Sequence, residues 1–144
     1  MRWMAVLSYL SHVVIEASPS DVFDFCSDLR NELAWNSKAD VVEKLTDGPV
    51  DVGTRYRAHW SNAGDVIVEM IEFDRSRSWA TRSSARGMDV LVRGTVGEED
   101  GRTRYTAHVS VHPRGLARLY APLAVRAMRR QEAANMRLIK NALE

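Results

Sequence analysis

The sequence predicts an α+β fold in which a curved antiparallel sheet of seven strands wraps around a long C-terminal helix, with two short helices after the first strand. Apolar and polar residues alternate with a period of two through the middle of the chain, and turn-forming residues separate these segments at short intervals. The stretch from Arg114 to Glu144 instead repeats its apolar residues at helical spacing. With 144 residues the chain can bury roughly two-thirds of its unfolded surface, so we expect one domain over residues 1–144.

The charge balance and the cysteine count argue against several classes of partner. Lys and Arg number 20 against 19 Asp and Glu, so a net charge of +1 offers no broad positive field for nucleic acid. Cys26, the single cysteine, has no partner for an internal disulfide, and no Cys or His cluster has zinc-ligand spacing. We therefore predict no nucleic-acid partner, no metal, no cofactor and a cytoplasmic location. The opening segment, MRWMAVLSYL, is too short and interrupted to span a membrane, so we expect no stable membrane insertion.

The first elements expected are a strand over Ser8–Glu16 and a helix that follows it. Ser18 suits the N-cap of this helix, because Pro19 needs no acceptor at the first helical position and Asp21 places a negative charge near the helix N-terminus. The helix should run to about Leu29. The apolar residues of this helix and of a second short helical turn are Val22, Phe25, Cys26, Leu29, Leu33 and Trp35.

Six further strands are expected after Trp35. They are the alternating segments 40–46, 54–60, 66–73, 78–84, 88–97 and 103–112. The short connections between them, such as Asp-Arg-Ser-Arg and Glu-Glu-Asp-Gly, predict antiparallel pairing, because parallel strands need long crossovers. In the C-terminal region, Pro122 would cost a continuous helix about 3 kcal/mol, so we expect a short helical turn before it and a long helix beginning near it.

The hairpins predict which face of the sheet is buried. Folding about Asn62-Ala63 sets Tyr56, Ala58 and Trp60 opposite Met70, Val68 and Val66, and on the reverse face it pairs Arg57 with Glu69. Folding about Asp100-Gly101 sets Val90, Val92, Gly94 and Val96 opposite Val111, Val109, Ala107 and Tyr105, with Arg93 opposite His108 on the other side. The inner face of the sheet then carries no ionisable group except phenols.

One strand does not fit this pattern. The register turns Ile67, Ile71 and Phe73 outward, which would expose much apolar surface to solvent. Either the strand contains a bulge, or this outer side makes a contact with another protein.

The residues expected to line a cavity lie on the inner face and on the C-terminal helix. They are Tyr56, Trp60, Met70, Trp79, Thr81, Ser83, Tyr105 and Leu123. The aromatic rings could stack on a ring-bearing ligand, and the hydroxyls of Thr81 and Ser83 could hydrogen-bond to it. For each aromatic residue, packing in the core is an equal alternative.

Catalytic residues are harder to identify. Glu69 is a weak candidate, because only a slipped or bulged strand would turn it into the cavity, and otherwise it pairs with Arg57 and Arg82 at the surface. His59, His108 and His112 point away from the cavity in the expected register, and Cys26 fits a packed thiol. The arginines of the C-terminal helix are expected to face solvent.

The order of elements, together with several short segments, resembles the START-like or SRPBCC superfamily, in particular its polyketide cyclase/dehydrase-like branch. The segments that carry the resemblance are Ala17–Phe23, Trp35, the run DGPVDVGTRY at 47–56, and the ending NMRLIKNALE at 135–144. The resemblance implies a helix-grip (Bet v 1/START-like) fold whose cavity takes lipids, polyketides or aromatic metabolites. It does not imply one reaction, because this fold hosts many functions.

Three hypotheses for function follow. The first is binding of a hydrophobic small molecule between the sheet and the C-terminal helix. The second is a polyketide aromatase/cyclase-type enzyme, in which Glu69 with Tyr56 or Ser83 moves protons. The third is a protein-interaction module whose partner covers Ile67, Ile71 and Phe73. A homodimer is compatible with each of them.

Overall fold

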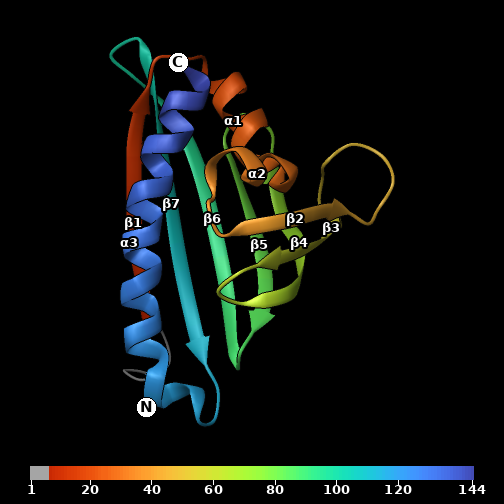
Figure 1. Ribbon diagram of the computed structural model, residues 1–144. Coiled ribbons are helices and arrows are strands. Elements are labelled where there is room, and N and C mark those ends of the chain that lie inside the picture. Colours follow the sequence, from red (N-terminus) through yellow and green to blue (C-terminus); the bar gives the residue numbers. More distant parts are fainter. Residues whose placement is uncertain (1–6) are drawn as a thin grey trace.

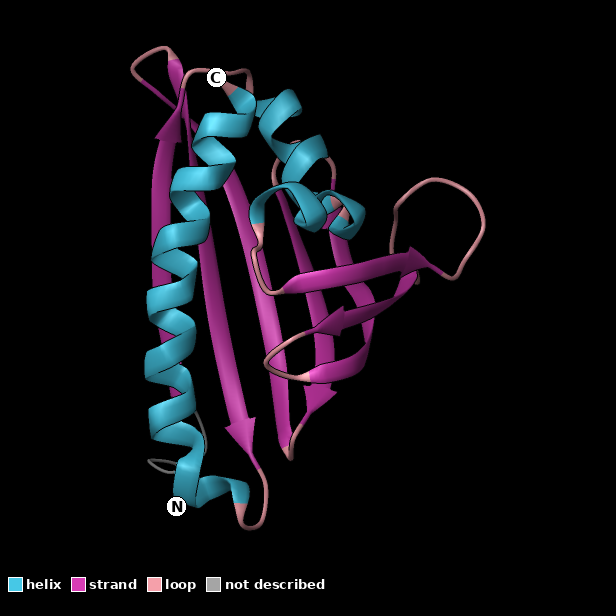
Figure 2. Ribbon diagram, viewed as in Figure 1, coloured by secondary structure: helices cyan, strands magenta, loops and turns pink. Residues whose placement is uncertain are grey.

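The computed structural model describes residues 7–144, and residues 1–6 of the opening segment MRWMAVLSYL lie outside the described residues. The elements are β1 (Leu7–Ile15), α1 (Pro19–Ser27), the short 3-10 helix η2 (Leu29–Asn31), α2 (Glu32–Trp35), β2 (Ala39–Lys44), β3 (Arg55–Trp60), β4 (Gly64–Asp74), β5 (Ser78–Ala85), β6 (Met88–Glu99), β7 (Arg102–Pro113) and α3 (Ala117–Leu143). Figure 2 shows the helices on one side of the curved sheet.

The seven strands form one antiparallel sheet in the order β1-β7-β6-β5-β4-β3-β2, which confirms the predicted architecture. In Figure 1, α3 runs alongside β1 and β7, while α1 and α2 lie near its C-terminal end. The end of α3 is joined to the end of β1: the Glu16 backbone N–H donates to Glu144 Oε2 (3.0 Å), and Lys140 Nζ donates to the Val14 carbonyl (3.1 Å). The long helix therefore covers one edge of the sheet, and the short helices cover part of the rest.

The predicted N-cap of α1 is confirmed. The Ser18 hydroxyl accepts a hydrogen bond from the Asp21 backbone N–H at 3.1 Å, and Pro19 occupies the first turn. The helix ends at Ser27, before the expected Leu29. Asp28 then caps the next turn by accepting from the Arg30 backbone N–H (3.1 Å), so the chain changes direction there.

The register of the β6–β7 hairpin agrees with the prediction. Val92 lies opposite Val109, and Arg93 opposite His108. Asp100 and Gly101 at the turn have φ angles of 51° and 78°. Two consecutive positive φ angles are the signature of the tight turn that Asp-Gly favours, so the turn chemistry sets the register.

The β3–β4 hairpin differs from the prediction by two residues. Tyr56 lies opposite Val68, and Glu69 lies opposite Arg55 rather than Arg57. The loop is shorter than expected, because β4 already begins at Gly64, whose φ of 78° is readily adopted only by glycine. A shift of two residues preserves the side-chain alternation, so the predicted inner face of β3 is unchanged.

A bulge in β4 explains the strand that did not fit. Met70 pairs with Thr81 but Glu72 pairs with Ala80, so one extra residue lies between them on β4. The bulge reverses the alternation and turns Phe73 inward. The ring of Phe73 contacts that of Phe23 edge-on, with centroids 5.3 Å apart. The bulge alternative is therefore correct for Phe73.

The expected break at Pro122 is absent, since α3 runs without interruption from Ala117 to Leu143. The first turn of any helix has free N–H groups, and Pro122 lies just after it. The proline therefore removes only one hydrogen bond, to the Arg118 carbonyl, close to the helix end. The prediction of two separate helical segments was wrong for this reason.

Buried apolar side chains form three clusters rather than one. The first joins α1 and the C-terminal half of α3 to the central strands and includes Phe23, Met70, Trp79, Tyr105 and Met136. The second lies under the N-terminal half of α3 and includes Tyr9, Val109 and Ala121. The third lies on β3 and β4 and includes Tyr56, Val66 and Val68. Polar groups of α2 and α3 lie near these clusters, and they form the site described next.

Candidate functional site

Most residues predicted to line a cavity lie in the interior. Tyr56, Met70, Trp79, Thr81 and Tyr105 are buried, and Trp60 and Ser83 are half-buried. Leu123 instead lies on the outer side of α3 with 71% of its surface exposed. The structure thus brings the sheet residues together beneath the helices and leaves Leu123 apart from them. Their role in binding remains a prediction.

The inner face of the sheet is not completely covered. Val90 and Val92 lie on β6 between two neighbouring strands, yet both are only half-buried. Their register partners Val111 and Val109 on β7, which lie closer to α3, are buried. Solvent therefore reaches the inner face beside α3, at the middle of the sheet.

A buried carboxyl group lies at this inner face. Glu32 of α2 is 8% exposed, and its Oε1 accepts hydrogen bonds from Trp60 Nε1 (3.1 Å) and Asn36 Nδ2 (2.9 Å). Burial raises the pKa of Glu32 from 4.5 to about 7, and the two hydrogen bonds oppose part of this rise. Trp60, predicted to line the cavity, thus positions an acid there.

A second carboxyl group comes from α3. Glu132 is half-buried on the side of the helix that faces the sheet, one turn from Met128 and Met136. Burial and the charge of Glu32 raise its pKa from 4.5 to about 7. The charge of Glu32 therefore disfavours ionisation of Glu132.

The charge of Glu132 also reaches buried groups on other elements. Desolvation is the largest cause of the raised pKa of Tyr9 on β1 and of Cys26 on α1, and the charge of Glu132 adds to both. The pKa of Cys26 is raised to about 12. Burial raises the pKa of Tyr105 on β7 as well, and Cys26, Glu132 and Glu32 add to that rise. Glu132 therefore lies near two phenols and a thiol, which stay protonated near neutral pH.

A polar joint connects α3 to the segment just after α2. Gln131 Nε2 donates to Ser37 Oγ (3.2 Å), and to Asn135 Oδ1 on the next turn of α3 (3.0 Å). The joint keeps Glu132 near Glu32. Two carboxyls with raised pKa values in a poorly solvated site can act as acid and base, or as hydrogen-bond partners of a ligand.

Sequence patterns carried a signal for only one of these acids. Glu132 falls within the helical repeat of Val125, Met128 and Met136, and an acid in an apolar stripe marks a group that is not on the solvent face. Glu32 belongs to a helix of four residues, too short for a periodic pattern. Its contact with Trp60 joins positions far apart in the chain, so no local pattern predicts it.

Glu69 does not meet the condition for a catalytic role. It points outward and pairs with Arg82 at 3.0 Å, whereas Arg57 pairs with Glu43 at 3.2 Å. The bulge lies after Met70, so it does not turn Glu69 inward. His59 contacts Asp65 (2.8 Å) on the outer side, as expected for a residue facing away from the interior.

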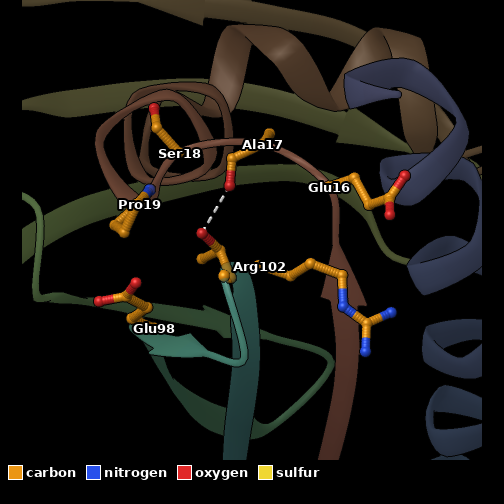
Figure 3. A pocket seen from close by; sticks show the side chains of 8 residues that line it. Glu16, Ala17, Ser18, Pro19, Glu98 and Arg102 are labelled. Atoms are coloured by element: carbon orange, nitrogen blue, oxygen red, sulfur yellow. Dashed lines mark hydrogen bonds between the residues drawn. The ribbon is translucent and has the colours of Figure 1, made fainter.

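A hollow of about 470 Å³ lies between the start of α1 and the β6–β7 turn (Figure 3). Its lining residues are Glu16, Ala17, Ser18, Pro19, Glu98, Gly101, Arg102 and Thr103. Thr103 Oγ1 donates to the Ala17 carbonyl (2.6 Å), which ties β7 to the loop before α1. None of the predicted cavity residues lines this polar hollow, so it is separate from the interior site.

Within residues 7–144, no group of three or more His, Cys, Asp and Glu side chains is placed to hold a metal ion. No helix of the described chain is long and apolar enough to cross a membrane. The indole nitrogens of Trp35 and Trp79 are buried, and among the described residues neither has a hydrogen-bond partner.

The sequence matches the family described as polyketide cyclase/dehydrase and lipid transport over residues 8–144. Comparison with curated proteins gave no significant match. The structure is similar to the Zhui aromatase/cyclase from Streptomyces sp. R1128, with a TM-score of 0.79 and 17% identity over 96% of this chain and 93% of that one. It is also similar to Ara h 8.0201, with a TM-score of 0.74 and 14% identity over 96% and 97% of the two chains.

A third similar structure is the di-domain aromatase/cyclase StfQ from the steffimycin biosynthetic pathway, with a TM-score of 0.82 and 9% identity. This chain is covered over 99% of its length but spans only 52% of StfQ. At these identities the likeness establishes a shared helix-grip fold and no shared activity.

Proposed function

The chain belongs to the polyketide cyclase/dehydrase and lipid transport family, within the START-like (SRPBCC) superfamily, and on this premise we propose that it binds a hydrophobic small molecule. The ligand lies between α3 and the inner face of the sheet. Its class is a lipid, a polyketide or an aromatic metabolite. Cytoplasmic location and the absence of a nucleic-acid partner belong to the same proposal, and a homodimer is compatible with it.

One observation carries this proposal. Val90 and Val92 on the central strand β6 remain half-buried, although their side chains point toward the helices. Trp60 and Ser83, on the same face, are half-buried too. Apolar surface that solvent reaches in a concave interior is what a hydrophobic ligand covers, and each square ångström covered contributes about 25 cal/mol.

The test is to extract purified protein under denaturing conditions and identify small molecules by mass spectrometry. Val92→Phe fills the inner face, and Leu91→Phe adds the same ring to the opposite face of the same strand as a matched control. We expect a bound molecule in the wild type and in Leu91→Phe, and none in a folded Val92→Phe. A wild type that carries no molecule and does not bind naphthalene on titration contradicts the proposal.

The buried acids favour a second candidate function, that of an aromatase/cyclase-type enzyme. One carboxylate takes a proton from the carbon beside a ketone while the other acid protonates the ketone oxygen, which forms an enol and moves one proton through the pair. Glu32 and Glu132 replace Glu69 in this role.

Proton exchange in tetralone, an apolar ring ketone, tests this activity. Deuterium uptake beside the carbonyl, followed by NMR, should be accelerated by the wild type and fall at least tenfold in Glu132→Gln. Glu69→Gln is the matched control, since that acid lies on the outer face. Equal uptake with and without protein argues for binding alone.

The structure removes most of the exposed apolar surface on which the interaction-module hypothesis depended. Phe73 points inward and Ile71 is half-buried, so of the three residues only Ile67 is exposed, at 49%.

A further inference from the structure

We propose that the outer face of the N-terminal half of α3 binds the surface of a lipid bilayer that carries anionic headgroups. The contact is peripheral: exposed leucines enter the boundary between headgroups and acyl chains, and arginines beside them pair with the headgroups. The inference goes beyond the proposed ligand binding and does not depend on it, because these side chains lie on the outside of the helix.

Three leucines form an exposed apolar ridge at the start of α3. Leu116, Leu119 and Leu123 are 81%, 80% and 71% exposed, the highest values of any large apolar side chain among residues 7–144. Intervals of three and four residues place them on one face of the helix. Ala117 and Ala121, which lie between them in the sequence, are buried in the second apolar cluster, so the ridge faces away from the sheet. Exposed apolar surface of this kind marks a contact site.

Arginines continue the same face toward the middle of α3. Arg126 and Arg130 follow Leu123 at intervals of three and then four residues, so they extend the line of the leucine ridge by two turns. Arg118 and Arg129 lie beside it. All four arginines are exposed, and none of them takes part in an ion pair within residues 7–144. Their charge is therefore available to a partner.

No acid interrupts this part of the chain. From Pro113 to Gln131 the sequence contains five arginines and neither Asp nor Glu. Arg114 pairs with Asp89 at 3.3 Å and is the one arginine of the five with an acidic partner among the described residues. The whole chain has a net charge of only +1, so the positive charge beside the leucine ridge is a local concentration.

Contacts with the β5–β6 turn hold this end of α3 in place and bring a sixth arginine to it. The Tyr120 hydroxyl donates to the carbonyl of Arg86, which is exposed, and the Arg114 backbone N–H donates to the Gly87 carbonyl (2.8 Å). Figure 1 shows this turn and the start of α3 at the same end of the molecule. A surface that is already ordered loses little conformational entropy when it binds.

An anionic bilayer matches this combination of groups. Leucine side chains gain free energy when they leave water for the acyl region, and guanidinium groups pair with phosphate. A nucleic acid would engage the arginines but leave the leucines in water. A protein would have to supply an apolar groove to receive a helix ridge, whereas the acyl boundary of a bilayer adapts to it. We therefore commit to the bilayer and treat a protein contact as an outcome of the test.

The experiment measures cosedimentation of the purified chain with lipid vesicles. One set of vesicles contains phosphatidylcholine with about one third phosphatidylserine, and the other contains phosphatidylcholine alone. We expect at least about tenfold stronger binding to the anionic vesicles in about 0.1 M salt. This preference should be lost in about 1 M salt, because the screening length falls from about 10 Å to about 3 Å.

A charge-reversal variant tests the arginines. Arg126→Glu together with Arg130→Glu should weaken binding to anionic vesicles at least about tenfold, since each arginine near such a surface contributes about fivefold. The matched control, Arg55→Glu with Arg77→Glu, changes the net charge equally at two exposed arginines outside α3. We expect the control to lose less than about threefold, because its charges lie away from the bilayer.

A second variant tests the leucine ridge. Leu119→Ser together with Leu123→Ser should also weaken binding at least about tenfold, because the serines gain little from the acyl boundary. Leu10→Ser with Leu33→Ser is the matched control, since these two leucines are exposed on β1 and α2. Far-ultraviolet circular dichroism and the urea midpoint identify any variant that loses its fold.

The outcomes decide the inference. Binding to neither kind of vesicle, or equal binding to both, refutes it. Losses in the control variants as large as those in the α3 variants refute the assignment to this face. A wild type that ignores vesicles but forms a dimer, which Leu119→Ser with Leu123→Ser dissociates, shows a contact between copies instead. Each of these results leaves the proposed ligand binding standing, because that function is tested separately by bound small molecules.

Discussion

Burial raises the pKa of Glu32 and of Glu132 from 4.5 to about 7. At pH values between 4.5 and about 7, each acid is therefore protonated to a greater extent in the folded chain than in the unfolded chain. Proton binding by the folded state stabilises it at low pH. The contribution is fully present below pH 4.5, falls as the pH rises toward 7, and is absent above that. These acids therefore reduce stability at neutral pH, which suits groups kept for a ligand rather than for folding.

Replacement of Glu132 by Gln removes the part of this pH dependence that Glu132 contributes, while the part from Glu32 remains. We expect the free energy of unfolding at about pH 8 to rise by about 2 kcal/mol, because the neutral amide has no charge to desolvate. At about pH 3 the difference from the wild type should almost vanish, since Glu132 is then protonated in both the folded and the unfolded state. Urea unfolding at several pH values measures the difference in free energy of unfolding between the variant and the wild type. A difference that does not depend on pH would contradict the raised pKa.

Position 94 requires a glycine, because the indole ring of Trp79 packs directly against its backbone. A Cβ at this position would be 2.5 Å from Trp79 Cζ2, and Trp79 is too deeply buried to move away freely. We expect Gly94→Ala to lower the free energy of unfolding by about 2 kcal/mol through overpacking. Gly97→Ala on the same strand is the control, because nothing lies within 4 Å of an added Cβ there. Equal urea midpoints for the two variants would contradict this packing.

At the scale of elements, the bulge of β4 decides which side chains reach the interior. Before it, Val66, Val68 and Met70 point inward, and after it Phe73 does. The bulge leaves Glu72 outside, where it pairs with Arg93 on β6. One extra residue thus supplies an aromatic ring to the core and an ion pair to the surface.

Truncation of the two apolar side chains on β4 tests the bulge. Phe73→Ala should lower the free energy of unfolding by about 3 kcal/mol, because it removes the ring that contacts Phe23. Ile67→Ala, on the outer face, should lower it by about 0.5 kcal/mol. Denaturant unfolding of both variants gives the comparison, and equally small losses for the two variants would place Phe73 on the outer face, as in the unbulged register.

At the scale of the whole molecule, shared strands connect the three apolar clusters. Val92 of β6 packs against both the first and the second cluster. On β4, Met70 belongs to the first cluster while Val66 and Val68 belong to the third. No cluster can lose its packing without disturbing a strand that another cluster uses.

We therefore expect the described chain to unfold in one cooperative transition. The tryptophan signal in near-ultraviolet circular dichroism and the backbone signal in the far ultraviolet should give the same urea midpoint. Val92→Ala should lower both midpoints together, because it weakens two clusters at once. Two separated transitions would show that the clusters are independent.

The sequence by itself determined the element order, the antiparallel pairing and the buried faces. Alternation with a period of two placed the strands, and Ser18 with Pro19 placed the start of α1. At β6–β7, the Asp100-Gly101 turn specified the register as well. These are local properties, since each depends on residues close together in the chain.

Only the tertiary structure decided the shorter β3–β4 loop, the bulge and the continuity of α3 through Pro122. It also decided the site, because Glu32 and Glu132 belong to α2 and α3, and the packing of these two helices brings the acids to the same interior. The raised pKa values of Glu32 and Glu132 arise from desolvation by distant segments. Local patterns specify which side of an element is buried, whereas what surrounds a buried group depends on how the elements pack.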